Sequence, residues 1–157
     1  ERPARLTRLE TEAAFAPAAI RRLAALLPND PAVNEAVGAR LKLSNAERQA
    51  LASAICTDLA AGPHELAYRI GPDRAADRLL LAQDPVAARQ AADWTPLRLP
   101  LTGGALIERG LSKGPDVARA LRQVEDRWIA EGFPDAARAG QIADAVVAEL
   151  LSRDSSA

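Results

Sequence analysis

Apolar residues recur along the chain at spacings of three and four, which is the period of one helix face. The most regular run covers residues 115–131 and predicts one long helix. Its stripe consists of Val117, Leu121, Val124 and Trp128. A second regular run predicts a last helix over about 135–151, and residues 152–157, where the pattern is lost, are predicted to be frayed.

Proline marks the start of most predicted helices, because a helix tolerates proline in its first turn, where the missing N–H would have no partner. Seven prolines precede stretches with helical spacing. They are Pro17, Pro31, Pro63, Pro72, Pro85, Pro115 and Pro134. Asp30 and Asp84 stand before two of these helices and are predicted N-caps. Ser44 and Glu47 form a capping box, which predicts a helix from about 45 to 60 that is closed by Gly62.

The composition agrees with an all-helical protein. Alanine supplies 36 residues and leucine 21, whereas valine, isoleucine and threonine together supply only 18. Residues 93–101 contain two prolines and no helical period, which predicts a linker. We therefore expect an all-α fold, an irregular array of short helices. A body-like subdomain over 1–92 would be followed by a tail-like three-helix subdomain over 102–157 that contains a helical hairpin.

Charge and reactive residues exclude several classes of protein. The 18 arginines and two lysines face 21 acidic residues, so the net charge of −1 gives no global basic field. One cysteine and one histidine exclude a disulfide framework and a zinc site built from this chain alone. No phosphate-binding P-loop, dinucleotide fingerprint or Asp-x-Asp metal pair occurs, so we predict no catalytic residue, no metal site and no cofactor in this chain. Cys56 is predicted to be buried within a helix and His64 to be an ordinary surface or packing residue.

We expect neither a membrane span nor a signal peptide in this sequence. No apolar run approaches the length of about 20 residues that a bilayer span requires, and the N-terminus lacks the order of a signal peptide. We expect a cytoplasmic protein with no membrane contact. The sequence begins at Glu1 and lacks methionine, so we interpret it as a piece of a longer protein; removal of a tag or processing is the alternative explanation.

Residues 102–121 predict a short helix that stops at Gly110, a three-residue turn, and a second helix that starts at Pro115. The free N–H groups and positive dipole at the start of that second helix are suited to binding phosphate. The candidate nucleic-acid contacts in this region are Arg109, Lys113, Gly114, Pro115 and Arg119. Alternatively, the glycines only permit a tight turn, and Asp116 already offsets the dipole.

A second candidate basic site lies before Ser44. Arg40, Lys42 and Arg48 flank the turn there and could form a local positive patch that contacts RNA. The alternative is that these charges are simply solvated, as charges around turns usually are.

Several segments together resemble the C-terminal half of bacterial CCA-adding tRNA nucleotidyltransferases of the poly(A) polymerase family. The most specific segment is 99–117, which reads LPLTGGALIERGLSKGPDV and ends in a Gly-x-x-x-Gly-Pro-x-Val core. The other matching parts, in chain order, are 20–28, 39–47, 68–82, Trp128-Ile129 and Phe133. Two positions depart from the family pattern: Gly104-Ala105-Leu106 stands where Lys-Asp-Leu is common, and Ala118 stands where glycine is frequent.

In that family a head domain carries the Gly-rich nucleotide loop and the metal-binding carboxylates, and the helical body and tail hold the tRNA. The resemblance thus implies that this chain is body and tail without the head and that it is not catalytic by itself. Its implied partners are tRNA or another structured RNA and the missing N-terminal head domain, which would bring the magnesium and nucleotide triphosphates.

Two other functions remain open. A helix-hairpin-helix module that binds DNA also opens a helix with Gly-Pro, although Ser112 stands where that motif normally has a further glycine. The other is a helical protein-interaction scaffold. The net charge is close to zero, and Trp94 lies within the predicted linker, where an exposed aromatic could anchor a partner.

Overall fold

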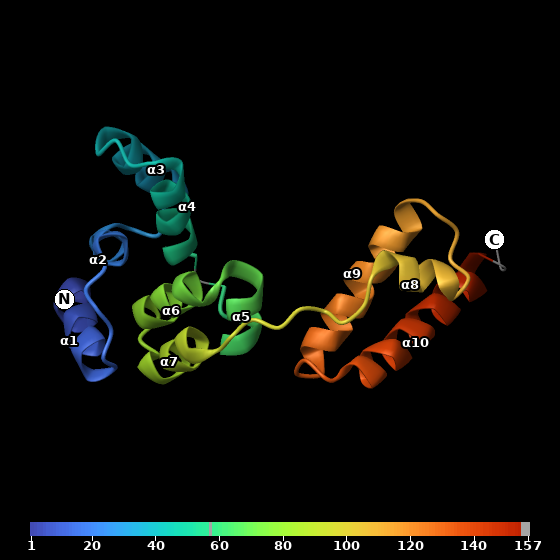
Figure 1. Cartoon of the computed structure of the whole chain (residues 1–157). Coiled ribbons are helices and arrows are strands. Elements are labelled where there is room, and N and C mark those ends of the chain that lie inside the picture. The colour runs from blue at the N-terminus through green and yellow to red at the C-terminus, as the bar shows by residue number, and fades with distance from the viewer. Residues whose placement is uncertain (57, 155–157) are drawn as a thin grey trace. The chain divides into compact units, whose positions relative to one another are not determined.

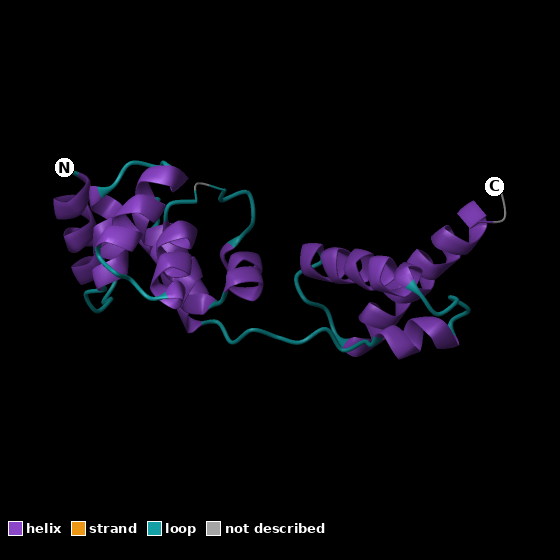
Figure 2. Cartoon of the chain, turned by 90° about the horizontal axis from the view of Figure 1, so that it is seen from above, coloured by secondary structure: helices purple, strands orange, loops and turns teal. Residues whose placement is uncertain are grey.

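The computed structural model describes residues 1–56 and 58–154, and this part of the chain contains ten helices and no strand (Figures 1 and 2). The prediction of an all-α fold is confirmed. The helices are α1 Arg2–Glu12, α2 Ala19–Leu26, α3 Pro31–Arg40, α4 Asn45–Ala54, α5 Pro63–Ile70, α6 Pro72–Leu81, α7 Pro85–Asp93, α8 Gly103–Glu108, α9 Pro115–Ala130 and α10 Ala136–Asp154.

The chain divides into two compact units, Glu1–Pro96 and Leu97–Ala157. The first unit holds α1 to α7 and the second α8 to α10. Each unit has buried hydrophobic residues of its own, so each is described by itself.

Helix α6 is the centre of the N-terminal unit, where it packs against α1, α2, α4, α5 and α7 (Figure 1). Many of the core side chains are alanines, and Ala67, Ala75, Ala88 and Ala91 are completely buried. Because alanine adds so little bulk, the helices of this unit can pack closely. Helices α3 and α4 pack on each other, and α4 also contacts α2 and α6.

In the C-terminal unit, α9 packs against both α8 and α10. Val124 and Trp128 from the predicted stripe of α9 are buried, as are Ile142 and Val146 of α10. The Trp128 ring meets Phe133 edge to face at 5.0 Å, and its indole N–H donates to the Pro134 carbonyl at 2.7 Å. Trp128 is therefore both the largest fully buried side chain of this unit and a polar anchor for the connection between α9 and α10.

The predicted caps are confirmed. The Asp30 carboxylate accepts from the backbone N–H groups of Ala32 and Val33, and the Asp84 side chain accepts from the Ala87 N–H at the start of α7. Both bonds of the Ser44–Glu47 capping box are present at the start of α4. The caps form as predicted because each joins groups only two or three residues apart.

The prediction that the fourth helix runs to about residue 60 and is closed by Gly62 is wrong, since α4 ends at Ala54. The Arg78 guanidinium of α6 bonds the Ser53 carbonyl at 3.0 Å, the Ser53 hydroxyl at 3.2 Å and the Asp58 carbonyl at 3.3 Å. These bonds hold the chain after α4 in a non-helical course. Cys56 consequently lies outside any helix and is exposed, so its predicted burial is also wrong.

The predicted helix start at Pro17 is two residues too early. Helix α2 begins at Ala19 rather than Pro17, because the Ala16 carbonyl accepts from the Arg21 side chain instead of from a helical N–H. Helix α10 begins at Ala136, within one residue of the predicted start at about 135, and the Pro134 carbonyl before it accepts from the Trp128 indole N–H.

The seven predicted proline starts do not include α1, which the structure adds at Arg2–Glu12 and which also has a proline, Pro3, in its first turn. At the other end, the prediction that the tail frays from residue 152 is wrong for the described part, because α10 continues to Asp154. The Ser152 hydroxyl bonds the Glu149 carbonyl at 2.9 Å, and Arg153 lies in the last turn, where a positive charge favours the helix dipole. Residues 155–157 lie outside the described part of the chain.

Candidate nucleic-acid interface

The connection between α8 and α9 is shaped by two glycines and a buried leucine. Gly110 ends α8 with a φ of +107° and Gly114 precedes α9 with a φ of +144°, conformations that residues with a Cβ rarely adopt. Between them, Leu111 is buried and its N–H bonds the Leu106 carbonyl at 3.3 Å. The turn is thus anchored at Leu111, while Gly114 faces open space.

The residues that follow Leu111 face solvent. Lys113, Gly114 and Pro115 are all exposed at the start of α9. Arg119 is exposed to 68 % one turn further along the helix and forms an ion pair with Asp116. The start of α9 therefore brings Lys113 and Arg119 to one helix end, and Asp116 partly offsets their positive charge.

Arg109 has a different role from the other candidate residues of this region. Its Nε donates to the Asp144 carboxylate of α10 at 2.6 Å, and one Nη donates to the Ala105 carbonyl at 2.8 Å. The Arg109 guanidinium also lies over Gly140 of α10. A Cβ added at Gly140 would lie 3.5 Å from Nη2 of Arg109. Arg109 therefore links α8 to α10, and we assign it to the scaffold beneath the turn.

One basic residue that the sequence patterns did not single out lies at the same end of the C-terminal unit. A Cβ on Gly110 would lie 3.7 Å from the Leu151 Cδ1 atom, so the last turns of α10 adjoin the end of α8. Exposed Arg153 belongs to this part of α10. Sequence spacing could not reveal this proximity, because Leu151 and Gly110 are brought together only by the packing of helices.

The second candidate site, at the turn between α3 and α4, is only partly available for binding. Arg40 and Lys42 are exposed there. The Arg48 guanidinium instead bonds Glu35 at 2.8 Å and the Asn45 side chain at 2.8 Å, and its stem covers Gly38. Arg48 thus joins α4 to α3, which leaves Arg40 and Lys42 as the exposed cations of this patch.

Sequence analysis did not identify the buried ion-pair network of the N-terminal unit. Arg21 is 4 % exposed and bonds Glu10, 2 % exposed, at 2.7 Å and Asp77 at 2.6 Å. Arg22 bonds the second oxygen of Glu10 at 2.8 Å. The Arg21 guanidinium also lies 5.8 Å from the Phe15 ring centre. The network ties α1, α2 and α6 together and is structural.

The two carboxyl groups of this network titrate in opposite directions. Burial by itself would raise the pKa of Glu10, but hydrogen bonds from Arg22 and Arg21 and the attraction of their charges together bring that pKa below its ordinary value. Burial dominates at Asp77 and raises its pKa, because the bond from Arg21 offsets only part of the desolvation.

We expect these shifts to affect stability against pH with opposite signs. As the pH falls below about 4.5, the ordinary pKa of glutamate, Glu10 of the unfolded chain takes up a proton before Glu10 of the folded chain does. Ionised Glu10 therefore stabilises the fold above this pH. The stabilisation is lost as the pH falls through the folded pKa of Glu10. Asp77, with its raised pKa, favours folding at low pH and loses that contribution as the pH rises above about 3.8. Urea unfolding between pH 3 and 6 should therefore give a shallower rise of unfolding free energy with pH for Glu10→Gln and a steeper rise for Asp77→Asn than for the unchanged protein. Equal slopes in all three proteins would contradict this prediction.

His64 and Trp94 stack on each other within the N-terminal unit, with ring centres 5.3 Å apart and planes inclined by 15°. Trp94 is half-buried and His64 is exposed. The predicted role of Trp94 as an exposed anchor for a partner is weakened, because one face of its ring is already covered by His64.

Within residues 1–56 and 58–154, no three histidine, cysteine, aspartate or glutamate side chains gather where a metal ion would bind. None of the helices in this described part is both long enough and apolar enough to cross a bilayer. Comparison with known proteins found no matching family model, no matching curated protein and no matching solved structure.

Proposed function

We propose that this chain is the RNA-binding C-terminal region of a protein like the tRNA nucleotidyltransferases and poly(A) polymerases. It would hold tRNA, or another structured RNA, so that the RNA 3′ end reaches a catalytic head domain that this chain does not contain. The observation that carries the proposal is the exposed Lys113-Gly114-Pro115 turn at the start of α9, with Arg119 one turn away. The resemblance of residues 99–117 to that family supports the same function.

The geometry of this turn suits contact with a phosphate backbone. The positive dipole end of α9 begins two residues after Lys113, and Gly114 carries no side chain that would block the approach of a phosphate to the first backbone N–H groups. Folded RNA is recognised mainly through its shape, its phosphates and its 2′-hydroxyls, so base-specific contacts are not required. Because Asp116 lies within the same turn, we expect weak binding that falls steeply with salt.

Removal of the two exposed cations should weaken RNA binding. We expect Lys113→Ala together with Arg119→Ala to raise the dissociation constant for bulk tRNA by about five- to tenfold in a fluorescence titration at low salt, which corresponds to about 1 kcal/mol. The slope of log affinity against log salt should also become shallower, because fewer counterions are released.

Arg138→Ala is the matched control, since Arg138 is an exposed arginine that pairs with Glu131 near the opposite end of α9. It should leave tRNA affinity unchanged. Equal affinity of the double variant and the unchanged protein would remove the assigned contact. Arg109 is left intact, because its loss would disturb the link to Asp144.

Two further measurements address the other functions. Duplex DNA that displaces tRNA at equal concentration would favour the helix-hairpin-helix alternative. Extension of an RNA primer by this chain with magnesium and nucleotide triphosphates alone would contradict the proposal that the catalytic residues lie elsewhere.

A further inference from the structure

The N-terminal unit contains a cavity of about 280 Å³ whose wall carries positive charge only. Two arginines, Arg2 and Arg78, line it, and no aspartate or glutamate does. The remaining lining residues are Asn29, Ala54, Ile55, Cys56, Leu59, Leu81 and Ala82. The cavity is thus lined mainly by apolar side chains. Two guanidinium groups and one amide side chain in its wall can bind a negative ligand.

Arg78 is unusual because its charge is buried without a carboxylate. Arg78 is 9 % exposed. Among the described residues, its guanidinium donates to three neutral oxygens: the Ser53 carbonyl, the Ser53 hydroxyl and the Asp58 carbonyl. None of the ion pairs of the described part of the chain includes Arg78, in contrast to Arg21, which contacts two carboxylates. Arg78 also lines a second cavity, of about 350 Å³, whose wall includes Asp58 and Glu65, but no ion pair of the described residues joins Arg78 to either carboxylate. Buried charges in proteins are normally paired, so the side of this guanidinium that faces the first cavity is a natural position for an external anion.

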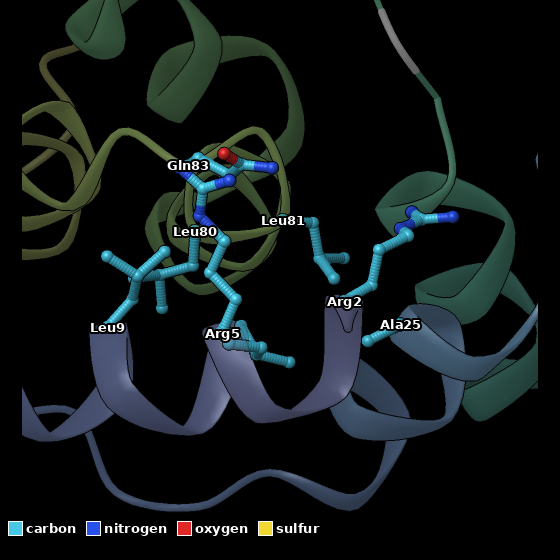
Figure 3. A pocket seen from close by; sticks show the side chains of 8 residues that line it. Arg2, Arg5, Leu9, Ala25, Leu80, Leu81 and Gln83 are labelled. Carbon is cyan, nitrogen blue, oxygen red and sulfur yellow. The ribbon is translucent and has the colours of Figure 1, made fainter.

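Arg2 supplies the second charge from α1. Its Nη1 donates to the Leu27 carbonyl at 3.3 Å, and the side chain is exposed. Figure 3 shows Arg2 and Arg5 rising from α1 with the Leu81 side chain between them. The crevice on the Arg5 side has a volume of only about 10 Å³, about one water molecule, whereas the cavity that Arg2 and Arg78 share is far larger.

The carbonyl ends of nearby helices offset only part of this charge. The cavity lies at the C-terminal ends of α4 and α6, and Arg2 also bonds the C-cap residue of α2. Each helix end carries about half a negative elementary charge. Three such ends amount to less than the two positive charges of the arginines, so the cavity keeps a positive excess.

We propose that this cavity binds a small oxyanion of the phosphate class, with Arg78 and Arg2 as its charged contacts and Asn29 as a polar one. The volume lies just below the range of about 300–1,000 Å³ that is usual for small-molecule sites, which suits a phosphate ion or a small phosphate ester. The site uses residues of the N-terminal unit only and does not depend on RNA binding at Lys113.

Cys56 provides a direct test, because it is the single cysteine of the chain, it is exposed, and it lines the cavity. We expect 20 mM inorganic phosphate to slow the alkylation of Cys56 by neutral iodoacetamide about fivefold, the factor for a dissociation constant of about 5 mM. Sodium chloride at the same ionic strength should have no such effect. Ribose 5-phosphate in place of inorganic phosphate then distinguishes a free phosphate ion from a phosphate ester as the ligand. Equal protection indicates the free ion, and stronger protection indicates the ester.

Arg2→Gln should abolish the protection, whereas Arg8→Gln, an equally exposed arginine of α1 that does not line the cavity, should keep it. Arg2 is chosen for substitution because loss of Arg78 could also release the segment after α4. Unchanged labelling at 100 mM phosphate, or full protection in Arg2→Gln, would overturn the proposal. The Lys113 and Arg119 variants should retain protection, so failure of this site and failure of the RNA contact are separately visible.

Discussion

Substitution of Arg21 by leucine should lower the unfolding free energy of the N-terminal unit by about 3–5 kcal/mol. The change removes the positive charge that lies between Glu10 and Asp77, 2.7 and 2.6 Å from their carboxylate oxygens. Glu10 is 2 % exposed and would keep only Arg22 as a partner. A buried carboxylate that has lost its counter-charge is costly, because water cannot replace the lost partner.

Amide hydrogen exchange measures this effect within each unit separately. Exchange at Leu79 and Leu80 of α6 should accelerate strongly in Arg21→Leu, while exchange at Val124 in the C-terminal unit should not change. Arg138→Gln serves as the surface control, since its pair with Glu131 is exposed on both sides and should contribute less than about 1 kcal/mol. A loss below 1 kcal/mol for Arg21→Leu would show that the network is not structural.

Truncation of Trp128 to alanine should have a comparable effect on the C-terminal unit, a loss of about 3–5 kcal/mol. Trp128 is 1 % exposed and packs edge to face on Phe133. The substitution leaves a cavity and also removes the donor to the Pro134 carbonyl. A unit of this size has little stability to lose, so we expect α8 to α10 to be largely unfolded at 25 °C.

Heteronuclear NMR of the whole chain tests this prediction. Signals from residues 103–154 should lose their dispersion in Trp128→Ala, and signals from α1 to α7 should remain. Trp128→Phe keeps a six-membered aromatic ring but loses the five-membered ring with its N–H, so it should fold with a smaller loss, about 1–2 kcal/mol. A fully folded C-terminal unit in Trp128→Ala would contradict the role assigned to this side chain.

Helix caps and buried stripes follow from the sequence alone. The capping box of Ser44 and Glu47 and the caps Asp30 and Asp84 form as predicted, since each depends on neighbours three residues away or fewer. The long helix α9 likewise follows from apolar spacing and a proline start. Such features need no knowledge of the tertiary structure, because helical geometry already fixes which residues meet.

The candidate site was predictable only in part. Lys113, Gly114 and Pro115 lie exposed at a helix start, as the glycine and proline pattern indicates. Two features depend on how α10 packs: Asp144, 35 residues away, engages Arg109, and the last turns of α10, which carry Arg153, adjoin the end of α8.

The sequence by itself determined that this protein is helical, where most of its helices begin, and which faces of the long helices are buried. Only the tertiary structure decided that α4 stops at Ala54, that Cys56 is exposed, and that Arg78 and Arg21 are buried with such different partners. The physical reason is the distance along the sequence over which each interaction acts. Local hydrogen bonds and apolar spacing act over three or four residues, whereas the partner of a long arginine side chain is set by helices that are far apart in the sequence and meet only on packing.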